Sequence, residues 1–300
     1  MPSGSMAVDL FFVMSGFVIA HAYDKRIPTL GVCGFIRLRA IRFYPLYLLG
    51  VGIGVFRQLI LLGIGSQELS LVGIAVSLIA ALVFLPAPPL SPVGDEISPL
   101  DGPAWSLILE MWINAAYALF FRFLTTPALV GVIILGGFTL AIGAFAGEVG
   151  GGFHWGDLPL GVARVCYSFP LGILIYRHRR KINVSPKMGK LTLFITILCF
   201  MVPISPYYNL IYILILSPCI LIGIFAAPFP APLASYCGTS SYCIYAIHMP
   251  LLILTAGIAH RLGFSGSWMV WFLIIILLLL TPILDRFYDR PFRKALSLTT

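Results

Sequence analysis

The chain has 300 residues, of which 60% are hydrophobic and only 10% are charged, and its net charge is +8. Soluble domains are closer to half apolar and a quarter charged, so this composition excludes an ordinary soluble enzyme. Apolar segments of about 18–25 residues fill most of the chain, and each is long enough to cross a bilayer. Because lipid cannot satisfy backbone hydrogen bonds, we predict an all-α, polytopic transmembrane bundle of about nine to ten segments, forming a single domain over residues 1–300.

The predicted membrane segments follow one another with short polar breaks. In chain order they lie near residues 8–23, 44–64, 69–86, 104–124, 128–146, 160–176, 191–204, 208–226, 240–259 and 268–285. The six cysteines have the spacing of neither a disulfide framework nor a zinc site, and we predict no metal site. The positive charge gathers between apolar segments, which indicates membrane topology and no nucleic-acid partner.

The distribution of Lys and Arg predicts the orientation of the chain. The basic loops predicted over 24–42 and 177–190, and the basic C-terminal tail, are expected in the cytoplasm, while loops 87–101 and 147–158 carry no Lys or Arg and are expected outside. This assignment requires 44–64 and 69–86 to make one crossing between them, so that one segment is re-entrant or interfacial. The alternative is that the charge rule fails for one of these loops. The same count places residue 1 outside, which predicts a further helix upstream.

Five ionisable residues lie at membrane depth, away from the ends of the predicted segments: Asp9, Arg57, Glu110, Arg164 and His248. Such groups cost at least a few kcal/mol each and are candidates for function. Glu110 should be protonated or pair with a cation, and Arg57 and Arg164 are possible partners. Two roles are open for it: a buried ion pair that fixes helix packing, or a position near an acceptor substrate. His248 can act as a general base near neutral pH, or it can simply bind a hydroxyl or carbonyl of a neighbouring helix.

Three arginines gather near the expected inner membrane boundary. Arg39 and Arg42 are spaced i, i+3 and would share one helix face, with Arg37 close by. Guanidinium groups bind phosphates through paired hydrogen bonds, so this stretch is a candidate docking site for a phosphate-rich cofactor. The alternative is a simple anchor to anionic lipid headgroups.

Five segments, taken in order, resemble the integral-membrane acyltransferase 3 family. They are DLFFVMSGF at residues 9–17; Arg39-x-x-Arg42 followed by Tyr44-Pro45-Leu46-Tyr47; Trp105-Ser106-Leu107-x-x-Glu110; Ser241-Tyr242-x-x-Tyr245-x-x-His248-x-Pro250; and Tyr288-Asp289-Arg290-Pro291-Phe292-Arg293. The resemblance implies about ten transmembrane helices with both ends inside. It also implies transfer of an acyl group, commonly acetyl, from a coenzyme A thioester to a hydroxyl of a cell-surface carbohydrate, a lipid-linked sugar or a similar acceptor.

Members of that family usually begin with a helix that carries an Arg and a catalytic His, and no residue of this sequence matches that helix. We therefore expect an N-terminally incomplete acyltransferase domain, onto which the family's catalytic His cannot be carried.

The function predicted from the sequence is a membrane-bound O-acyltransferase of a bacterial inner membrane, with a cytoplasmic C-terminus. Acyl-CoA would be a donor substrate held at its phosphates by Arg37, Arg39 and Arg42, and no cofactor would be bound permanently. His248 is the best substitute base, while Asp9 and Glu110 would position reacting groups. The alternatives are a transporter or flippase for a glycolipid or small anion, and an inactive truncated homologue that serves as a membrane scaffold.

Overall fold

The computed structural model describes residues 5–65, 68–89, 94–148, 150–203, 205–226, 230–261 and 268–298. It is 82% helical and contains no strand within these ranges, which confirms the all-α prediction. The elements are α1 (Met6–Tyr23), α2 (Ile27–Gly63), α3 (Leu71–Leu82), η1 (Gly102–Ala104), α4 (Trp105–Leu119), η2 (Phe121–Phe123), α5 (Thr126–Phe145), α6 (Leu158–His178), η3 (Arg179–Lys181), α7 (Pro186–Cys199), α8 (Pro206–Ile211), η4 (Tyr212–Leu216), α9 (Ser217–Ala226), α10 (Ala231–Arg261), α11 (Trp268–Leu284), η5 (Asp285–Asp289) and α12 (Arg290–Leu298).

Seven helical segments of the described chain are long and apolar enough to cross a membrane. They are Met6–Tyr23, Ile27–Gly63, Thr126–Phe145, Leu158–Lys181, Pro206–Phe225, Ala231–Ala259 and Trp271–Ser297. All ten predicted segments are helical, but three of them, α3, α4 and α7, have only 12, 15 and 14 residues. At 1.5 Å per residue, α3 reaches only about 18 Å, well short of a bilayer's hydrocarbon core. The region that holds α2 and α3 therefore contains one helix of spanning length, and the number of crossings that it makes stays a prediction.

The predicted loop over residues 24–42 was wrong. The helix α2 begins at Ile27 and runs for 37 residues, interrupted at Gly31, whose φ of 66° is left-handed. The part after this interruption, residues 32–63, is about 48 Å long, so it must extend beyond the hydrocarbon at one end or both. Arg39 and Arg42 lie within it and share a helix face, as their spacing indicated.

The chain divides into two compact units. The first unit comprises Met1–Ile36 and Leu109–Phe229, and the second comprises Arg37–Ile108 and Pro230–Thr300. Helices α2 and α4 each contribute residues to both units. The single domain expected over residues 1–300 stays a prediction.

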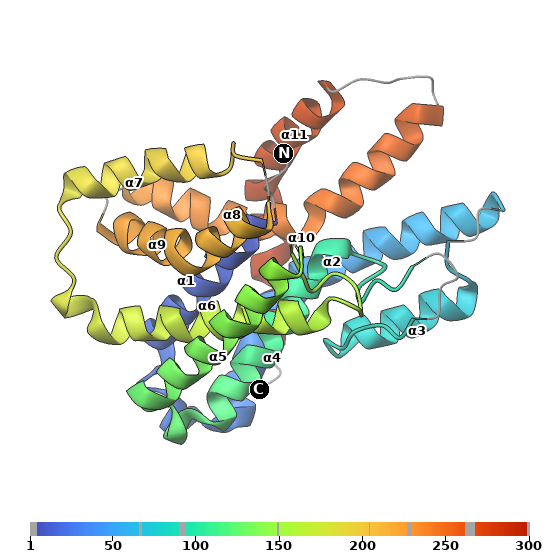
Figure 1. Ribbon diagram of the computed structural model, residues 1–300. Helices are drawn as coiled ribbons and strands as arrows, with labels where there is room; N and C mark the ends of the chain where they lie inside the picture. The colour runs from blue at the N-terminus through green and yellow to red at the C-terminus, as the bar shows by residue number, and fades with distance from the viewer. Residues whose placement is uncertain are drawn as a thin grey trace. The chain divides into compact units, whose positions relative to one another are not determined.

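In the first unit, α6 is flanked by α1 and α5, and α7 lies along α9 (Figure 1). Glycines allow α1 and α6 to approach closely. A Cβ added to Gly16 would lie 2.0 Å from the carbonyl oxygen of Phe169, and one added to Gly172 would lie 2.1 Å from that of Val13. In lipid no hydrophobic driving force brings helices together, so close van der Waals packing stabilises the pair, and small residues at the contact permit that packing.

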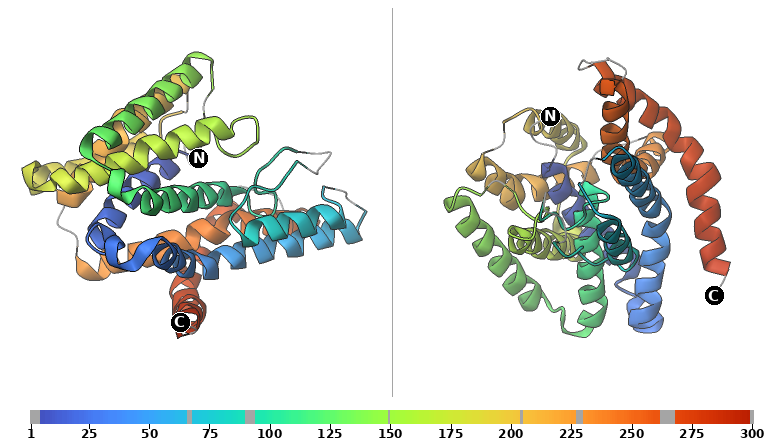
Figure 2. Two further views of the ribbon diagram at one scale, coloured as in Figure 1. Left: turned by 90° about the horizontal axis from the view of Figure 1, so that it is seen from below. Right: turned by 90° about the vertical axis from the view of Figure 1, so that its right-hand side faces the viewer.

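In the second unit, α10 packs against α11, and α11, η5 and α12 form one continuous helical rod (Figure 2). Glycines again permit close contact. A Cβ on Gly50 would lie 2.2 Å from the carbonyl oxygen of Ala246, and one on Gly54 would lie 1.8 Å from that of Leu100. These contacts fix α2 against α10 and against the segment before α4, which positions the side chains described next.

Candidate functional site

Arg42 lies at the centre of a charged cluster in the second unit. Its guanidinium carbon is 4.9 Å from the centroid of the Tyr242 ring, and the Tyr242 hydroxyl donates to the carbonyl oxygen of Phe43 at 2.7 Å. The charges of Asp285, Asp289 and Arg293 also act on Arg42. Three stretches of sequence that carry family motifs therefore meet at this cluster.

The sequence analysis named Asp289 only within the fifth family segment and did not single out Asp285. Asp285 and Asp289 are only 6% and 2% exposed. Arg290 binds Asp285 at 2.6 Å, while Arg293 binds Asp289 and lies 3.6 Å from Asp285. The tail had been counted only for its cations, although the i, i+4 spacing of Asp289 and Arg293 indicates such a pair.

The widened turn η5 carries both aspartates. Pro291 lies two residues after its end, and proline cannot donate the backbone hydrogen bond that would keep the turn a regular α-helix. Widened turns of this kind are frequent at functional sites. Here the turn presents Asp285 and Asp289 to the same set of arginines.

The three arginines predicted to hold a donor have different surroundings. Arg37 is exposed, whereas Arg39 and Arg42 are half-buried. The Arg39 guanidinium lies over the ring of Phe43, 4.6 Å from its centroid. The charges of Arg293 and of the two aspartates of η5 all act on Arg42, so Arg37 and Arg39 are the two predicted donor-binding arginines outside that cluster.

A second polar group in the same unit contains His248. The Tyr245 hydroxyl donates to the carbonyl oxygen of Pro103 at 2.9 Å and shares a hydrogen bond with the Ser106 hydroxyl. His248 Nδ1 lies 2.9 Å from the carbonyl oxygen of Tyr245 and 3.1 Å from that of Ile244. Carbonyl oxygens only accept, so Nδ1 carries the proton and Nε2 keeps a lone pair that can accept one.

Pro250 follows His248 by two residues, and its missing N–H frees the carbonyl of Ala246, four residues earlier. That carbonyl faces Gly50 and is not one of those that His248 binds. His248 binds other carbonyls of its own helix and none of a neighbouring one among the contacts described above.

Asp9 and Arg164 form a fully buried ion pair in the first unit. Arg164 Nε and one terminal nitrogen each lie 2.8 Å from a different carboxylate oxygen of Asp9. The remaining guanidinium donors bind the carbonyl oxygens of Gly151 and Ser5, both at 2.9 Å. Exposure is 0% for Asp9 and 2% for Arg164. This geometry gives Asp9 a structural partner, whereas the sequence had suggested that it positions reacting groups.

Glu110 is also fully buried in the first unit. It accepts hydrogen bonds from the hydroxyl of Ser15 and from Asn114 Nδ2, the latter at 3.0 Å. The two cations expected as its partners bind other carboxylates: Arg164 binds Asp9, and Arg57 binds Glu68 at 2.9 Å. The Ser15 contact joins the first family segment to the Glu110 segment.

Asp101 is a buried acid that the sequence placed in an exterior loop. It is 1% exposed, and neither carboxylate oxygen has a hydrogen-bond partner among the described residues. Burial raises the pKa of its carboxyl to about 8. Asp101 lies against α2, because a Cβ on Gly50 would be 2.7 Å from its Oδ2. It is therefore held neutral at the start of the segment that leads into α4.

Comparison with known proteins decides the family. The acyltransferase 3 model, described as an acyltransferase domain, matches residues 1–284. The chain belongs to this family. One curated relative is Protein 2 in picA locus of Rhizobium radiobacter, 38% identical over 126 residues, a match that covers 39% of this chain and 65% of that protein. Another is the exopolysaccharide production protein ExoZ of Rhizobium meliloti (strain 1021), 36% identical over 115 residues, covering 38% of this chain and 33% of that protein.

The matches therefore span less than two thirds of the length of each of these relatives. No solved structure matches the chain. Family membership and the spanning helices make the chain an integral membrane protein of the acyltransferase 3 family, which confirms the resemblance seen in its five motifs.

Proposed function

We propose that this chain is a membrane O-acyltransferase of a bacterial inner membrane, with its C-terminus in the cytoplasm. It would transfer an acyl group, with acetyl as the first candidate, from acyl-CoA to a hydroxyl of an exported or cell-surface carbohydrate. The observation that carries the proposal is the meeting of Arg42, Tyr242 and Asp289, three family-motif residues from distant parts of the sequence. The name of the relative ExoZ, an exopolysaccharide production protein, supports a carbohydrate acceptor.

The charge of the second unit suits a polyanionic donor. Segments 37–42 and 285–294 together contain seven cations and two aspartates. Within this set Arg42 lies over the Tyr242 ring in the cluster with η5, and its main task would be to position the segment. Arg39 and Arg37 would contact the phosphates of acyl-CoA, since guanidinium groups bind phosphate oxygens in pairs.

The reaction itself needs one base and good alignment. The acceptor hydroxyl oxygen attacks the thioester carbonyl carbon, a C–O bond forms, the C–S bond breaks, and the coenzyme A thiolate receives the proton. Within the second unit, His248 Nε2 has the lone pair to carry that proton. Holding donor and acceptor in contact supplies several kcal/mol of the rate enhancement. Glu110, held by Ser15 and Asn114, would orient the acceptor or a catalytic His; Asp9 would act only through its pair with Arg164.

The test uses protein purified in lipid nanodiscs, labelled acetyl-CoA and de-O-acetylated exopolysaccharide. Alkali-labile label on the polysaccharide is the expected product. Arg39→Gln should raise the KM for acetyl-CoA about 10- to 100-fold, the value of one or two charged hydrogen bonds. Arg180→Gln removes the same charge from an exposed side chain and is the matched control. Arg39 is a cleaner target than Arg42, whose loss would leave two buried aspartates less compensated.

Two outcomes would overturn the proposal. A KM that is unchanged in Arg39→Gln, in protein whose melting temperature matches wild type, would remove the donor-site assignment. Movement of a labelled glycolipid between leaflets without ester formation would identify a flippase. His248→Ala with full kcat would remove the base assignment alone and leave the acyltransferase proposal standing.

A further inference from the structure

A groove of about 470 Å³ in the second unit lies beside the charged cluster described above and shares Asp285 and Arg290 with it. Its walls come from the first turns of α10 and from the junction of α11, η5 and α12. Hydroxyl groups and arginines line it: Ser235, Thr239, Ser240, Thr281, Arg286 and Arg290. The groove is large enough for a small polar headgroup.

Two of these residues have unused capacity to bind an anion. Ser240 is 4% exposed, and its hydroxyl oxygen is buried without a hydrogen-bond partner among the described residues. Arg286 has a ring contact with Phe287 and no ion pair in the described part of the chain. Arg290 is paired with Asp285, so the three charged side chains in the groove leave one net positive charge. A buried hydroxyl left unsatisfied costs about 1–3 kcal/mol, which a bound ligand would recover.

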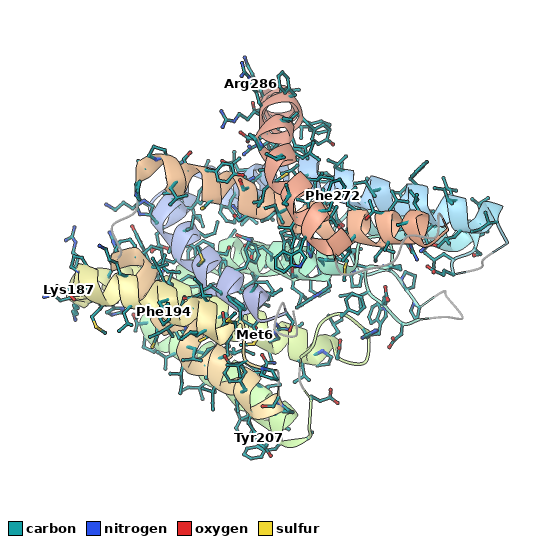
Figure 3. The ribbon with its side chains drawn as sticks, turned by 90° about the horizontal axis from the view of Figure 1, so that it is seen from above. Met6, Lys187, Phe194, Tyr207, Phe272 and Arg286 are labelled. Carbon is teal, nitrogen blue, oxygen red and sulfur yellow. The ribbon has the colours of Figure 1, made fainter. Side chains whose placement is uncertain are left out.

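The rod that carries one wall of the groove also has an exposed apolar face. Leu279, Ile283 and Phe287 are 67%, 52% and 71% exposed. Phe272 and Arg286 lie toward opposite ends of the α11–η5 rod (Figure 3). The 14 helical steps from one to the other cover about 21 Å, more than the roughly 15 Å of one leaflet's hydrocarbon. An apolar helix face of leaflet length thus leads away from a cationic, hydroxyl-rich groove.

We propose that this groove binds the phosphate headgroup of an anionic glycerophospholipid, whose acyl chains lie along the exposed face of α11. The phosphate would accept hydrogen bonds from Ser240 and Arg286. Basic grooves between membrane helices bind such headgroups because the lipid supplies both the anion and the tails. An acyl-CoA donor with a short acyl group would leave the apolar face uncovered, so the lipid is the better occupant. The proposal does not depend on the acyltransferase activity.

The experiment titrates purified protein in detergent with phosphatidylglycerol or phosphatidylcholine of identical acyl chains and counts bound lipids by native mass spectrometry. Wild type should bind phosphatidylglycerol more tightly. Arg286→Gln should weaken that binding about five-fold, and Ser240→Ala about three-fold, without changing the affinity for phosphatidylcholine. Arg180→Gln, the same change on an exposed side chain elsewhere, should bind as wild type does. Melting temperatures verify that each variant is folded.

Equal affinity for the two lipids, or wild-type binding by both Arg286→Gln and Ser240→Ala, would overturn the proposal. A competition arm separates a lipid site from a donor site. Free coenzyme A that displaces phosphatidylglycerol one for one would assign the groove to the acyl donor and would also overturn it. Retention of the lipid under saturating coenzyme A is the result that the proposal requires. Because every readout is binding, failure of the transfer assay leaves this test unaffected.

Discussion

Asp9→Asn should lower the free energy of unfolding by about 3–5 kcal/mol, because it leaves a buried guanidinium without its counter-charge. Arg164 uses two donors on Asp9, each at 2.8 Å, and both side chains are essentially inaccessible to solvent. An asparagine offers one acceptor oxygen and turns an N–H group toward the other donor. The backbone carbonyls of Gly151 and Ser5 still bind Arg164, but they carry no full charge.

The assay is thermal unfolding of detergent-purified protein, for which a loss of 3–5 kcal/mol corresponds to roughly 6–10 °C in Tm at a scale of roughly 2 °C per kcal/mol. The informative partner is the double variant Asp9→Leu with Arg164→Met. Removing both charges together replaces the pair with apolar side chains, which is often neutral. We expect the double variant to recover most of the Tm lost by either single change, with a coupling energy above about 2 kcal/mol.

A loss below about 1 kcal/mol in Asp9→Asn would refute this reasoning, as would additive single changes in the double-mutant cycle. The same cycle separates structure from catalysis. A double variant that regains its Tm and its acyl transfer assigns the pair to stability alone. A stable double variant without transfer would return Asp9 to the reacting groups.

Three further changes test other contacts. Gly16→Leu should prevent stable folding, because the new side chain would clash with the backbone of Phe169. Gly131 faces open space among the described residues, so Gly131→Leu should fold normally. Expression level and a monodisperse elution profile measure the folding of both variants. Asp101→Asn should flatten the pH dependence of Tm. Burial raises the pKa of the Asp101 carboxyl to about 8 in the folded protein, so the wild-type protein loses stability as the pH rises from about 4 to 8. The loss is at most about 1.4 kcal/mol per pH unit. Identical profiles of Tm against pH for the wild type and Asp101→Asn would contradict this reasoning. Ser15→Ala should cost about 1.5–3 kcal/mol by removing a hydrogen bond to a buried carboxylate, and an unchanged Tm would argue against that bond.

Some of the site could be predicted from the order of residues because it is local. The i, i+3 spacing of Arg39 and Arg42 places them on one helix face, and α2 confirms this. Charge counting along the chain predicts that 44–64 and 69–86 make one crossing between them. The 12 residues of α3 are compatible with this, and the number of crossings stays a prediction. The partners of Glu110 could not be predicted in this way, because spacing gives no information about which of several distant cations a buried carboxylate meets.

The composition, the apolar segments and the five motifs were enough to determine an all-α membrane protein of the acyltransferase 3 family, because helix formation in lipid is dictated by local apolarity and backbone hydrogen bonding. Only the tertiary structure decided the pairing of Asp9 with Arg164, residues 155 positions apart, and the burial of Asp285, Asp289 and Asp101. The reason is physical. A charge in low dielectric is stabilised by whichever counter-charge the helix packing brings within about 3 Å, and that packing is set by close glycine contacts such as Gly16 against Phe169.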